Sequence, residues 1–511
     1  MMRVTSPAKL NNNWGRRSVF VVCLLFGSPA FAASCESLAS LALANTKIDL
    51  AQAVSAGQFT PPGNGGRGGT TFINLPSFCR VAATLKPTDD SEVKIEVWLP
   101  SSNWNNALQS VGNGAWAGTI SHAAMATALA AGYATASTDT GHTGNNPDFI
   151  TGHPEKLIDF AYRSVHEMTV AAKAIVAAYY GKAAAHSYWN GCSTGGRQAL
   201  AEAQRYPGDY DGIIAGAPAN YVTHLQGQQV WMNQIVHQEE AAYISVDKYR
   251  LLHDAVMKAC DALDGVKDGV LEDPTRCHFD QKELACSGTD TSTCLTLPQV
   301  EAIRKIYNGP VSPKGGKSLF PGLERGSEMG WATLSGPKPM SLAEETYKFI
   351  VLQDKNWNYM SFDPERDMAI ADKNAGALMN SIDPNLQPFF GRGGKLLMYH
   401  GWADPGIAPG NSVNYYNSVV ERVRSADSIR LFMVPGMGHC RGGDGTDTFD
   451  AMAALSSWVE KGKSLERIEA SHQTRGAVDR TRPLCPYPQV AVYSGSGSTD
   501  ESANFSCKAS R

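Results

Sequence analysis

One pentapeptide places the tightest constraint on how this chain can fold. Gly191-Cys192-Ser193-Thr194-Gly195 follows a short segment, 186–190, that we predict to be a strand, and it precedes a run of helix formers over 196–206. A G-x-S-x-G sequence between a strand and a helix is typical of a sharp turn that exposes the serine hydroxyl. The flanking glycines let the backbone come close at that turn. We therefore predict that Ser193 is a nucleophile at the carboxyl edge of a sheet.

The sequence around this motif alternates between strand and helix patterns, which is typical of an α/β domain. We expect a helix over 164–180 and another over 446–460. Several of the predicted strands end in glycine-rich or polar turns. The predicted strands are 93–99, 107–111, 133–137, 186–190, 212–215, 395–399 and 429–434.

The alternation stops between residues 221 and 392. We interpret this segment as a lid domain inserted into a catalytic domain made of residues 33–220 and 393–511. The length of 511 residues fits two cores better than one. The lid carries aromatic side chains that either pack in its core or contact an aromatic substrate, namely Trp331, Tyr347, Phe349, Trp357, Tyr359 and Phe362.

A base and an acid for Ser193 should follow it in the order serine, acid, histidine. His439 lies in a glycine-rich loop directly after the strand 429–434, and Asp404 follows the strand 395–399. We predict that His439 is the general base and that Asp404 orients its ring. Among the 12 histidines, His400, His142 and His224 are weaker candidates for the base.

An oxyanion hole needs two main-chain N–H donors close to the serine. We expect one from Thr194, the residue after the nucleophile. The other should come from the loop Gly112-Asn113-Gly114-Ala115, and we favour Gly114. The alternative is that this loop is only a tight turn.

The N-terminus has the pattern of a secretory signal. Positive charges precede the apolar run 18–26, and Ala30-Phe31-Ala32 is a cleavage pattern, so we predict a signal peptide over 1–32. The run is far shorter than the roughly 20 residues of a membrane-spanning helix. The mature protein would be secreted or periplasmic, with no membrane segment. A lipid anchor at Cys35 is the alternative.

Cleavage removes Cys23 and leaves ten of the 11 cysteines, an even number that suggests up to five disulfides in an exported chain. The cysteines beside the serine and the histidine, Cys192 and Cys440, would then bond to each other. The other expected pairs are Cys35 with Cys79, Cys260 with Cys277, Cys286 with Cys294, and Cys485 with Cys507.

The segment 261–270 carries three aspartates and two glycines within ten residues. Oxygen ligands of this kind suit Ca²⁺, and a bridge between Cys260 and Cys277 would close the loop. A solvated acidic turn is the alternative. The net charge of −4 provides no basic footprint for nucleic acid.

These motifs together resemble the tannase/feruloyl esterase family. The resemblance rests on Gly191-Cys192-Ser193-Thr194-Gly195-Gly196-Arg197, on His400-Gly401-Trp402-Ala403-Asp404, and on Gly438-His439-Cys440. It implies an α/β-hydrolase fold with a large inserted lid. It also implies a structural Ca²⁺ bound by the side chains of Asp261, Asp264 and Asp268 and by the main-chain carbonyls of Val266 and Val270.

The family implies hydrolysis of aromatic acid esters, such as hydroxycinnamates and gallates. We expect a secreted serine ester hydrolase of the feruloyl esterase type, acting on a small aromatic ester that can be attached to plant polysaccharide. Tannase and mono(2-hydroxyethyl) terephthalate hydrolase are the alternatives within the family. Thr194 stands where the resemblance to the terephthalate enzyme implies Glu. A non-catalytic phenolic- or carbohydrate-binding protein is the alternative from another class.

Overall fold

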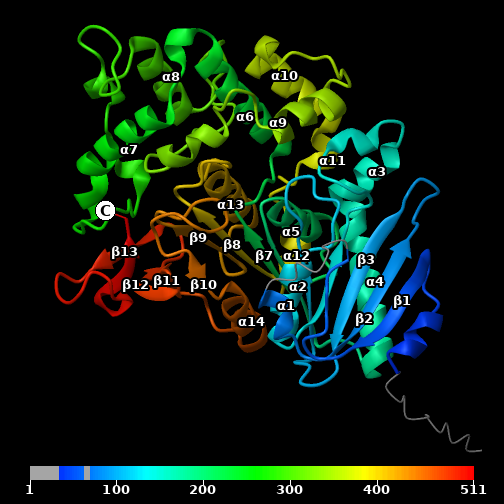
Figure 1. Cartoon of the computed structure of the whole chain (residues 1–511). Helices are drawn as coiled ribbons and strands as arrows, with labels where there is room; N and C mark the ends of the chain where they lie inside the picture. Colours follow the sequence, from blue (N-terminus) through cyan, green and yellow to red (C-terminus); the bar gives the residue numbers. More distant parts are fainter. Residues whose placement is uncertain (1–33, 63–69, 511) are drawn as a thin grey trace, which may run out of the picture.

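A mixed sheet of nine strands forms the centre of the protein (Figure 1). The computed structural model describes residues 34–62 and 70–510, so the predicted signal peptide lies outside the described residues. Strands β1 to β3 and the β3–β5 pair are antiparallel, and the pairs from β5 to β9 are parallel. In sheet order the strands are β1 (Thr46–Val54), β2 (Phe78–Leu85), β3 (Val93–Pro100), β5 (Ala134–Thr138), β4 (Ala107–Val111), β6 (His186–Cys192), β7 (Gly212–Gly216), β8 (Lys395–Gly401) and β9 (Ile429–Val434).

Helices cover both faces of this sheet. One face packs against α4 (Ser164–Tyr180), α5 (Thr194–Arg205) and α13 (Gly410–Val423), and the other packs against α2 (His122–Ala130) and α14 (Ala451–Lys461). Within β8, Leu396 and Met398 join the first core and Leu397 joins the second, as the alternation of a strand requires. Shorter helices are α1 (Thr70–Ile73) and α3 (Pro154–Ile158). The architecture is the predicted α/β-hydrolase fold.

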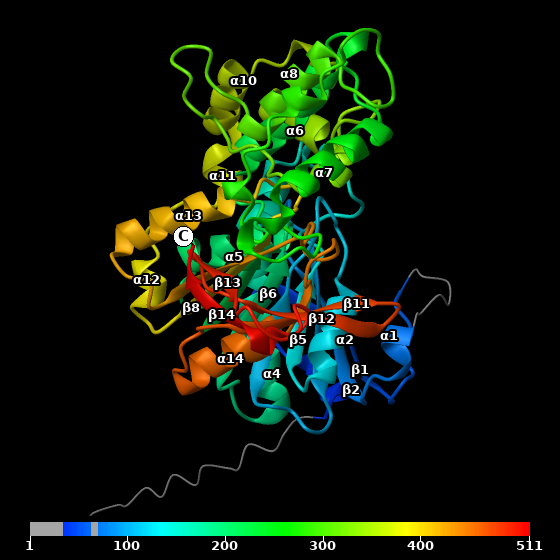
Figure 2. The ribbon, with the colours of Figure 1, turned by 90° about the vertical axis from the view of Figure 1, so that its left-hand side faces the viewer.

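Most of the segment between β7 and β8 lies above the sheet in Figures 1 and 2, but its last helix, α12 (Gln387–Phe390), lies beside β8. Its described residues form helices and loops, with no strand of the three sheets. We keep 221–392 as a proposed inserted lid, although Leu386 and Phe389, near its end, pack in the core against the sheet. Its helices are α6 (Val222–His237), α7 (Val246–Cys260), α8 (Leu297–Asn308), α9 (Ser341–Glu345), α10 (Pro364–Ala371), α11 (Ala377–Met379) and α12 (Gln387–Phe390).

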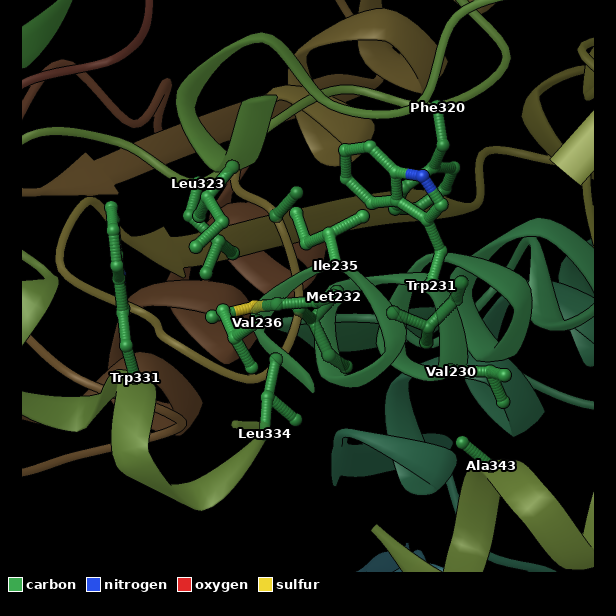
Figure 3. Close-up of a cluster of buried hydrophobic side chains, with 14 of the residues drawn as sticks. Val230, Trp231, Met232, Ile235, Val236, Phe320, Leu323, Trp331, Leu334 and Ala343 are labelled. Carbon is green, nitrogen blue, oxygen red and sulfur yellow. The ribbon is translucent and has the colours of Figure 1, made fainter. Parts of the chain in front are cut away.

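Helix α6 is the central element of the lid, because every residue from Val222 to Val236 is buried. Its apolar side chains pack with Trp331 and Leu334 in the cluster of Figure 3. Its amide side chains donate to carbonyls of the surrounding loops; for example, Asn233 Nδ2 donates to Leu334 O at 3.1 Å. A helix with so many polar residues can be buried because these bonds satisfy much of its polarity.

Two small sheets complete the C-terminal part. The first contains β10 (Thr448–Phe449), β11 (Ile468–Thr474) and β12 (Ala477–Leu484), and the second contains β13 (Gln489–Tyr493) and β14 (Phe505–Ala509). The helix predicted over 446–460 is wrong at its start. Asp450 accepts a hydrogen bond from Ala453 N, which caps the helix and leaves the preceding residues to β10. In the described part of the chain, no helix is both long and apolar enough to cross a membrane.

The structure contains the five predicted disulfides. Cys35 is bonded to Cys79, which leaves no thiol there for a lipid anchor. This bond ties the N-terminal segment to β2. The bond between Cys192 and Cys440 joins residues 248 positions apart.

The disulfides should stabilise the fold according to the length of chain that each closes. A Cys35→Ala/Cys79→Ala variant removes a link across 44 positions, and loop-closure entropy predicts a loss of about 4 kcal/mol in the free energy of unfolding. The control, Cys286→Ala/Cys294→Ala, spans 8 positions, with an expected loss of about 2.5 kcal/mol. Denaturant unfolding measures both. A larger loss in the control would contradict the loop-length argument.

Candidate active site

Ser193 occupies the turn between β6 and α5. Its φ of +62° is a conformation that residues other than glycine rarely adopt. Ser193 N donates to Gly216 O at 3.0 Å, and Ser193 O accepts from Arg197 N and Ala219 N. These three main-chain bonds hold the strained turn. The side chain of Ser193 lines a cavity under the lid.

The glycines around this turn are required by close backbone contacts. A Cβ atom on Gly191 would lie 2.5 Å from Gly195 O, and one on Gly112, at the end of β4, would lie 2.5 Å from Gly195 Cα. No side chain fits at such distances. The start of α5 is therefore packed directly against the ends of β4 and β6.

His439 and Asp404 form a hydrogen-bonded pair beside this turn. His439 Nδ1 donates to Asp404 Oδ2 at 2.7 Å, which leaves Nε2 of the imidazole ring for a proton from another group. Asp404 is fully buried, and His439 is partly exposed. No hydrogen bond between Ser193 Oγ and His439 is present in the described structure, but both side chains line the same cavity.

Asp404 accepts four hydrogen bonds. Oδ1 accepts from Gly406 N and Ile407 N at 2.8 and 2.9 Å, and Oδ2 accepts from His439 and from His400 Nε2. Burial alone would raise the pKa of Asp404, but the bonds from His400 and His439 lower it well below its ordinary value. His400, considered above as a weaker base, is instead a fully buried second partner of this carboxylate.

The charge of Asp404 acts on His439 in turn. Burial alone would lower the pKa of His439, but the hydrogen bond and the charge of Asp404 raise it above the ordinary value of 6.5. The Cys192–Cys440 disulfide joins the neighbours of Ser193 and His439. It therefore connects the two halves of the candidate site covalently.

The loop after β4 lines the same cavity as Ser193 and His439. Thr194 Oγ1 donates to Ala115 O at 3.0 Å, and Asn113 Nδ2 donates to Thr119 O and Thr138 O. Gly114 lines the cavity, with no atom within 4 Å of the position of an added Cβ. Within the described residues, the main-chain N–H groups of Gly114 and Thr194 have no acceptor. Two free donors thus lie on the loop and the helix start beside Ser193.

The cavity that contains Ser193 and His439 has a volume of about 450 Å³. The other predicted site residues at the cavity wall are Thr194, Gly114, Cys192 and Cys440. Apolar side chains dominate the rest of its lining, which includes Trp116, Phe160, Val222, Leu225, Met340 and Leu342. A mostly apolar cavity with a few polar groups is typical of a small-molecule site.

The predicted aromatic residues of the lid do not line this cavity. Trp331 and Tyr347 are fully buried in the lid core. The aromatic lining comes instead from Trp116, which follows the Gly114 loop, and from Phe160, which precedes α4. The sequence reasoning missed both. The sequence offered a signal for Trp116 alone, because it stands two residues after Gly114, which we had assigned to the oxyanion hole.

The acidic loop begins at the end of α7 and is closed by the Cys260–Cys277 disulfide. Asp261 Oδ1 accepts from Asp268 N and Gly269 N, and Asp268 Oδ2 accepts from Arg482 Nη2 at 2.5 Å. Burial, together with the charges of Asp268 and Asp261, raises the pKa of Asp264 to about 6. The loop thus concentrates oxygen donors and negative charge.

In the described ranges, three potential metal-donor atoms lie within 4.8 Å of one another in one place, on Cys286, Asp290 and Cys294. Its two sulfurs are bonded to each other, so they are not thiolate ligands. The carboxylates of Asp261, Asp264 and Asp268 are spread more widely than this. The loop therefore carries oxygen donors of the kind that Ca²⁺ prefers, but its three carboxylates do not converge on one point.

Comparison with known proteins extends these observations. A family model described as "Tannase and feruloyl esterase" matches residues 79–508. An uncharacterized esterase of Xanthomonas campestris pv. campestris is 36% identical, over 96% of this chain and 94% of that protein. A probable feruloyl esterase B-2 of Aspergillus oryzae is 33% identical, over 94% and 96%. The crystal structure of feruloyl esterase B from Aspergillus oryzae superposes with a TM-score of 0.86 at 30% identity, over 93% of this chain and 99% of that one.

The His439–Asp404 pair makes a prediction about protonation. Asp404 favours the imidazolium form of His439, so the pKa of His439 should lie above 6.5. His439 should be protonated below that pKa and lose the proton as the pH rises through it. Asp404→Asn removes the negative charge, so the pKa should fall. NMR titration of the histidine side chains, with His439→Gln for assignment, measures this.

Asp479→Asn provides the matched control, because Asp479 makes the same kind of contact with His472 on the surface. It should leave the pKa of His439 unchanged. An unchanged pKa of His439 in Asp404→Asn would show that the contact does not control the protonation of the ring.

Proposed function

Because this chain belongs to the tannase and feruloyl esterase family and is a carboxylic ester hydrolase, we propose that it cleaves esters of aromatic acids through an acyl-enzyme on Ser193. The observation that carries this proposal is the convergence of Ser193 and the His439–Asp404 pair on one apolar cavity. In this proposal the acyl group lies in that cavity.

The reaction begins when His439 Nε2 accepts the proton of Ser193 and Ser193 Oγ attacks the ester carbonyl. Asp404 keeps the hydrogen on His439 Nδ1 and stabilises the imidazolium that forms. The hydrogen bonds from Gly406 and Ile407 hold the carboxylate in place during this step. Since only neutral His439 accepts the proton, acylation is lost as the pH falls through the pKa of His439.

The carbonyl oxygen becomes an oxyanion during the attack. We assign its stabilisation to the N–H groups of Thr194 and Gly114, which have no other acceptor within the described residues. Preorganised donors of this kind lower the barrier because they need no reorientation as charge develops. The bond from Thr194 Oγ1 to Ala115 O fixes the Gly114 loop relative to α5.

Collapse of the intermediate requires a proton for the leaving alcohol. His439 supplies it, and the ester bond then breaks to leave the acyl group on Ser193. A water molecule then gives a proton to His439 and attacks the acyl carbonyl. When this second intermediate collapses, His439 returns the proton to Ser193 Oγ, which releases the acid and restores free Ser193. The Cys192–Cys440 bond keeps serine and histidine in register through both steps.

The substrate class follows from the cavity lining and from the family. Trp116 and Phe160 offer flat apolar surfaces that suit an aromatic acyl group. We favour a feruloyl or other hydroxycinnamoyl ester, with plant polysaccharide as a source of such esters. A gallate ester and mono(2-hydroxyethyl) terephthalate are the alternative substrates.

We also propose that the protein works outside the cytoplasm, as a secreted or periplasmic enzyme. Five disulfides in the structure support an oxidising compartment, because thiols are kept reduced in the cytosol. The signal-like N-terminus agrees with this proposal.

The proposed function is tested by hydrolysis of four esters: methyl ferulate, methyl gallate, mono(2-hydroxyethyl) terephthalate and p-nitrophenyl acetate. We expect kcat/KM to be highest for methyl ferulate, because the cavity suits an aromatic acyl group. Ser193→Ala should lower kcat by at least about 10⁴-fold, since it removes the nucleophile.

The outcomes of this panel separate the alternatives. A preference for the gallate or the terephthalate ester would replace the feruloyl assignment. Activity on p-nitrophenyl acetate alone would remove the aromatic-acid assignment. Equal turnover by Ser193→Ala would exclude Ser193 as the nucleophile, and no hydrolysis of any of the four esters would overturn the proposed acyl class.

We further propose that the loop 261–270 binds a structural Ca²⁺. The donors would be the carboxylates of Asp261, Asp264 and Asp268 and the carbonyls of Val266 and Val270. Three features of the loop support this proposal: all the donors are oxygens, two glycines with positive φ turn the loop, and a disulfide closes it. Bound Ca²⁺ would supply charge neutralisation in the lid and take no part in the chemistry at Ser193.

Thermal unfolding after chelation tests this site without reference to activity. Adding Ca²⁺ at about a hundred times its Kd should raise the stability by about 2.7 kcal/mol. Asp264→Asn should abolish this increase. Asp254→Asn, an exposed aspartate on α7, should retain it. A melting temperature that does not respond to Ca²⁺ in the wild-type protein would rule the site out.

A further inference from the structure

The proposed lid contacts the turn that holds Asp404. In this turn, Asp404 Oδ1 accepts hydrogen bonds from the main-chain N–H groups of Gly406 and Ile407. Gln229, on the buried helix α6 of the lid, donates through Nε2 to Gly406 O at 2.7 Å. Gln229 and these two residues of the turn line the cavity that contains His439. The lid therefore reaches the candidate catalytic acid through the main chain of its turn.

A single peptide group connects Gln229 to Asp404. Gly406 O and Ile407 N belong to the same planar peptide unit. Its carbonyl accepts from Gln229, and its N–H donates to Asp404 Oδ1 at 2.9 Å. Donation to the carbonyl of a peptide polarises the peptide and strengthens its N–H as a donor. A hydrogen-bond chain thus runs from α6 to the carboxylate, and it fixes the orientation of the peptide between them.

The Gln229 side chain makes this bond and no other within the described residues. Gln229 is 3% exposed, and its Oε1 has no hydrogen-bond partner in the described part of the chain. A carbonyl oxygen only accepts, so the NH₂ of the amide must face Gly406. Among the described residues, no other group donates to Gly406 O. Loss of the Gln229 amide would therefore leave this carbonyl unpaired and free the peptide to turn.

The lid also packs against the turn at Pro405. A Cβ atom on Gly330, in the short lid helix Glu328–Thr333, would lie 2.4 Å from Pro405 Cγ. No side chain fits at that distance. The lid thus contacts two successive residues of the turn, Pro405 and Gly406. The position of the carboxylate therefore depends on the lid as well as on the sheet.

We propose that Gln229 is a positioning residue for Asp404. It holds the peptide between Gly406 and Ile407, so that the carboxylate keeps its orientation toward the imidazole of His439. The lid then supports the catalytic acid in addition to covering the cavity. This inference rests on the proposed function, since it takes Asp404 as the group that orients His439 during ester cleavage.

Gln228 provides a matched control on the same helix. It is 1% exposed, its Oε1 is also unpaired in the described structure, and its Nε2 donates at 3.0 Å to Pro321 O, a carbonyl of the lid. Gln228→Met and Gln229→Met each remove one such bond and keep a side chain of similar length. Only the bond of Gln229 leads to Asp404. A difference in catalysis between the two variants therefore belongs to the turn of the acid.

The kinetic test compares kcat for methyl ferulate and for p-nitrophenyl acetate. Gln229→Met should lower kcat for both esters by the same factor, roughly 3- to 10-fold, as the loss of one hydrogen bond predicts. The factor should be the same because the acid acts in proton transfer whatever the acyl group. KM should change by less than about 2-fold, since no substrate contact is removed. Gln228→Met should keep the wild-type kcat.

A second variant protects the test against a failure to fold. Gln229→Asn keeps a polar amide, but its side chain is one methylene too short to reach Gly406 O. It should show the same loss of kcat as Gln229→Met. Thermal melting establishes that each variant is folded.

A spectroscopic test follows the hydrogen-bond chain without substrate. NMR measures the exchange with water of the Ile407 amide proton and of the His439 Nδ1 proton. Both should exchange roughly 3- to 10-fold faster in Gln229→Met, because the chain that protects them is broken at its first bond. Gln228→Met should leave both exchange rates at the wild-type value.

The outcomes distinguish this inference from the proposed function. Wild-type kcat and wild-type exchange rates in the folded Gln229 variants would overturn it. A loss of activity confined to methyl ferulate would assign Gln229 to contact with the acyl group instead, and equal losses in the Gln228 and Gln229 variants would show a general effect of the lid. No hydrolysis of either ester by the wild-type protein would overturn the proposed function, and the exchange rates would still test the hydrogen-bond chain.

Discussion

The contact between the end of β4 and the start of α5 is the constraint on which the rest of the site depends. Gly112 and Gly195 are so close that a Cβ on the first would lie 2.5 Å from the second. This approach sets the strained φ of Ser193 and brings the loop of Gly114 beside the first N–H of the helix. A side chain at Gly112 would move the proposed nucleophile, Ser193, and a proposed oxyanion donor together. In the proposed mechanism, attack and charge stabilisation are therefore coupled through the backbone.

A second constraint explains how the site tolerates a long insertion. The chain leaves the sheet after β7 and returns at β8, and these strands are direct parallel neighbours. The lid can therefore be inserted without opening the sheet, while the loops bearing Asp404 and His439 stay at its carboxyl edge. The Cys192–Cys440 bond links parts of the chain on either side of the insertion. It therefore keeps His439 beside Ser193 although the insertion separates them in the sequence.

The sequence predicted the residues whose local signals are strong. Ser193, Asp404 and His439 each follow a predicted strand and lie in glycine-containing turns, and parallel strands bring such turns to one edge. The strands β1 and β2 escaped prediction. Four of the nine residues of β1 are exposed at the sheet edge and none is buried, so it lacks the apolar pattern of a buried strand. Trp116 and Phe160 carry no periodic signal either, because only the sheet order brings their loops together. Their roles required the three-dimensional structure.

The polarity of the cavity suggests which of its groups act in catalysis and which select the substrate. The groups assigned to chemistry are main-chain donors and a serine–histidine pair, which would treat any ester carbonyl alike. The remaining wall is mostly apolar and includes Trp116 and Phe160, so selection among acids must come from how well each acyl group fits that wall. Substrate choice would therefore be set in the part of the cavity that catalysis does not need.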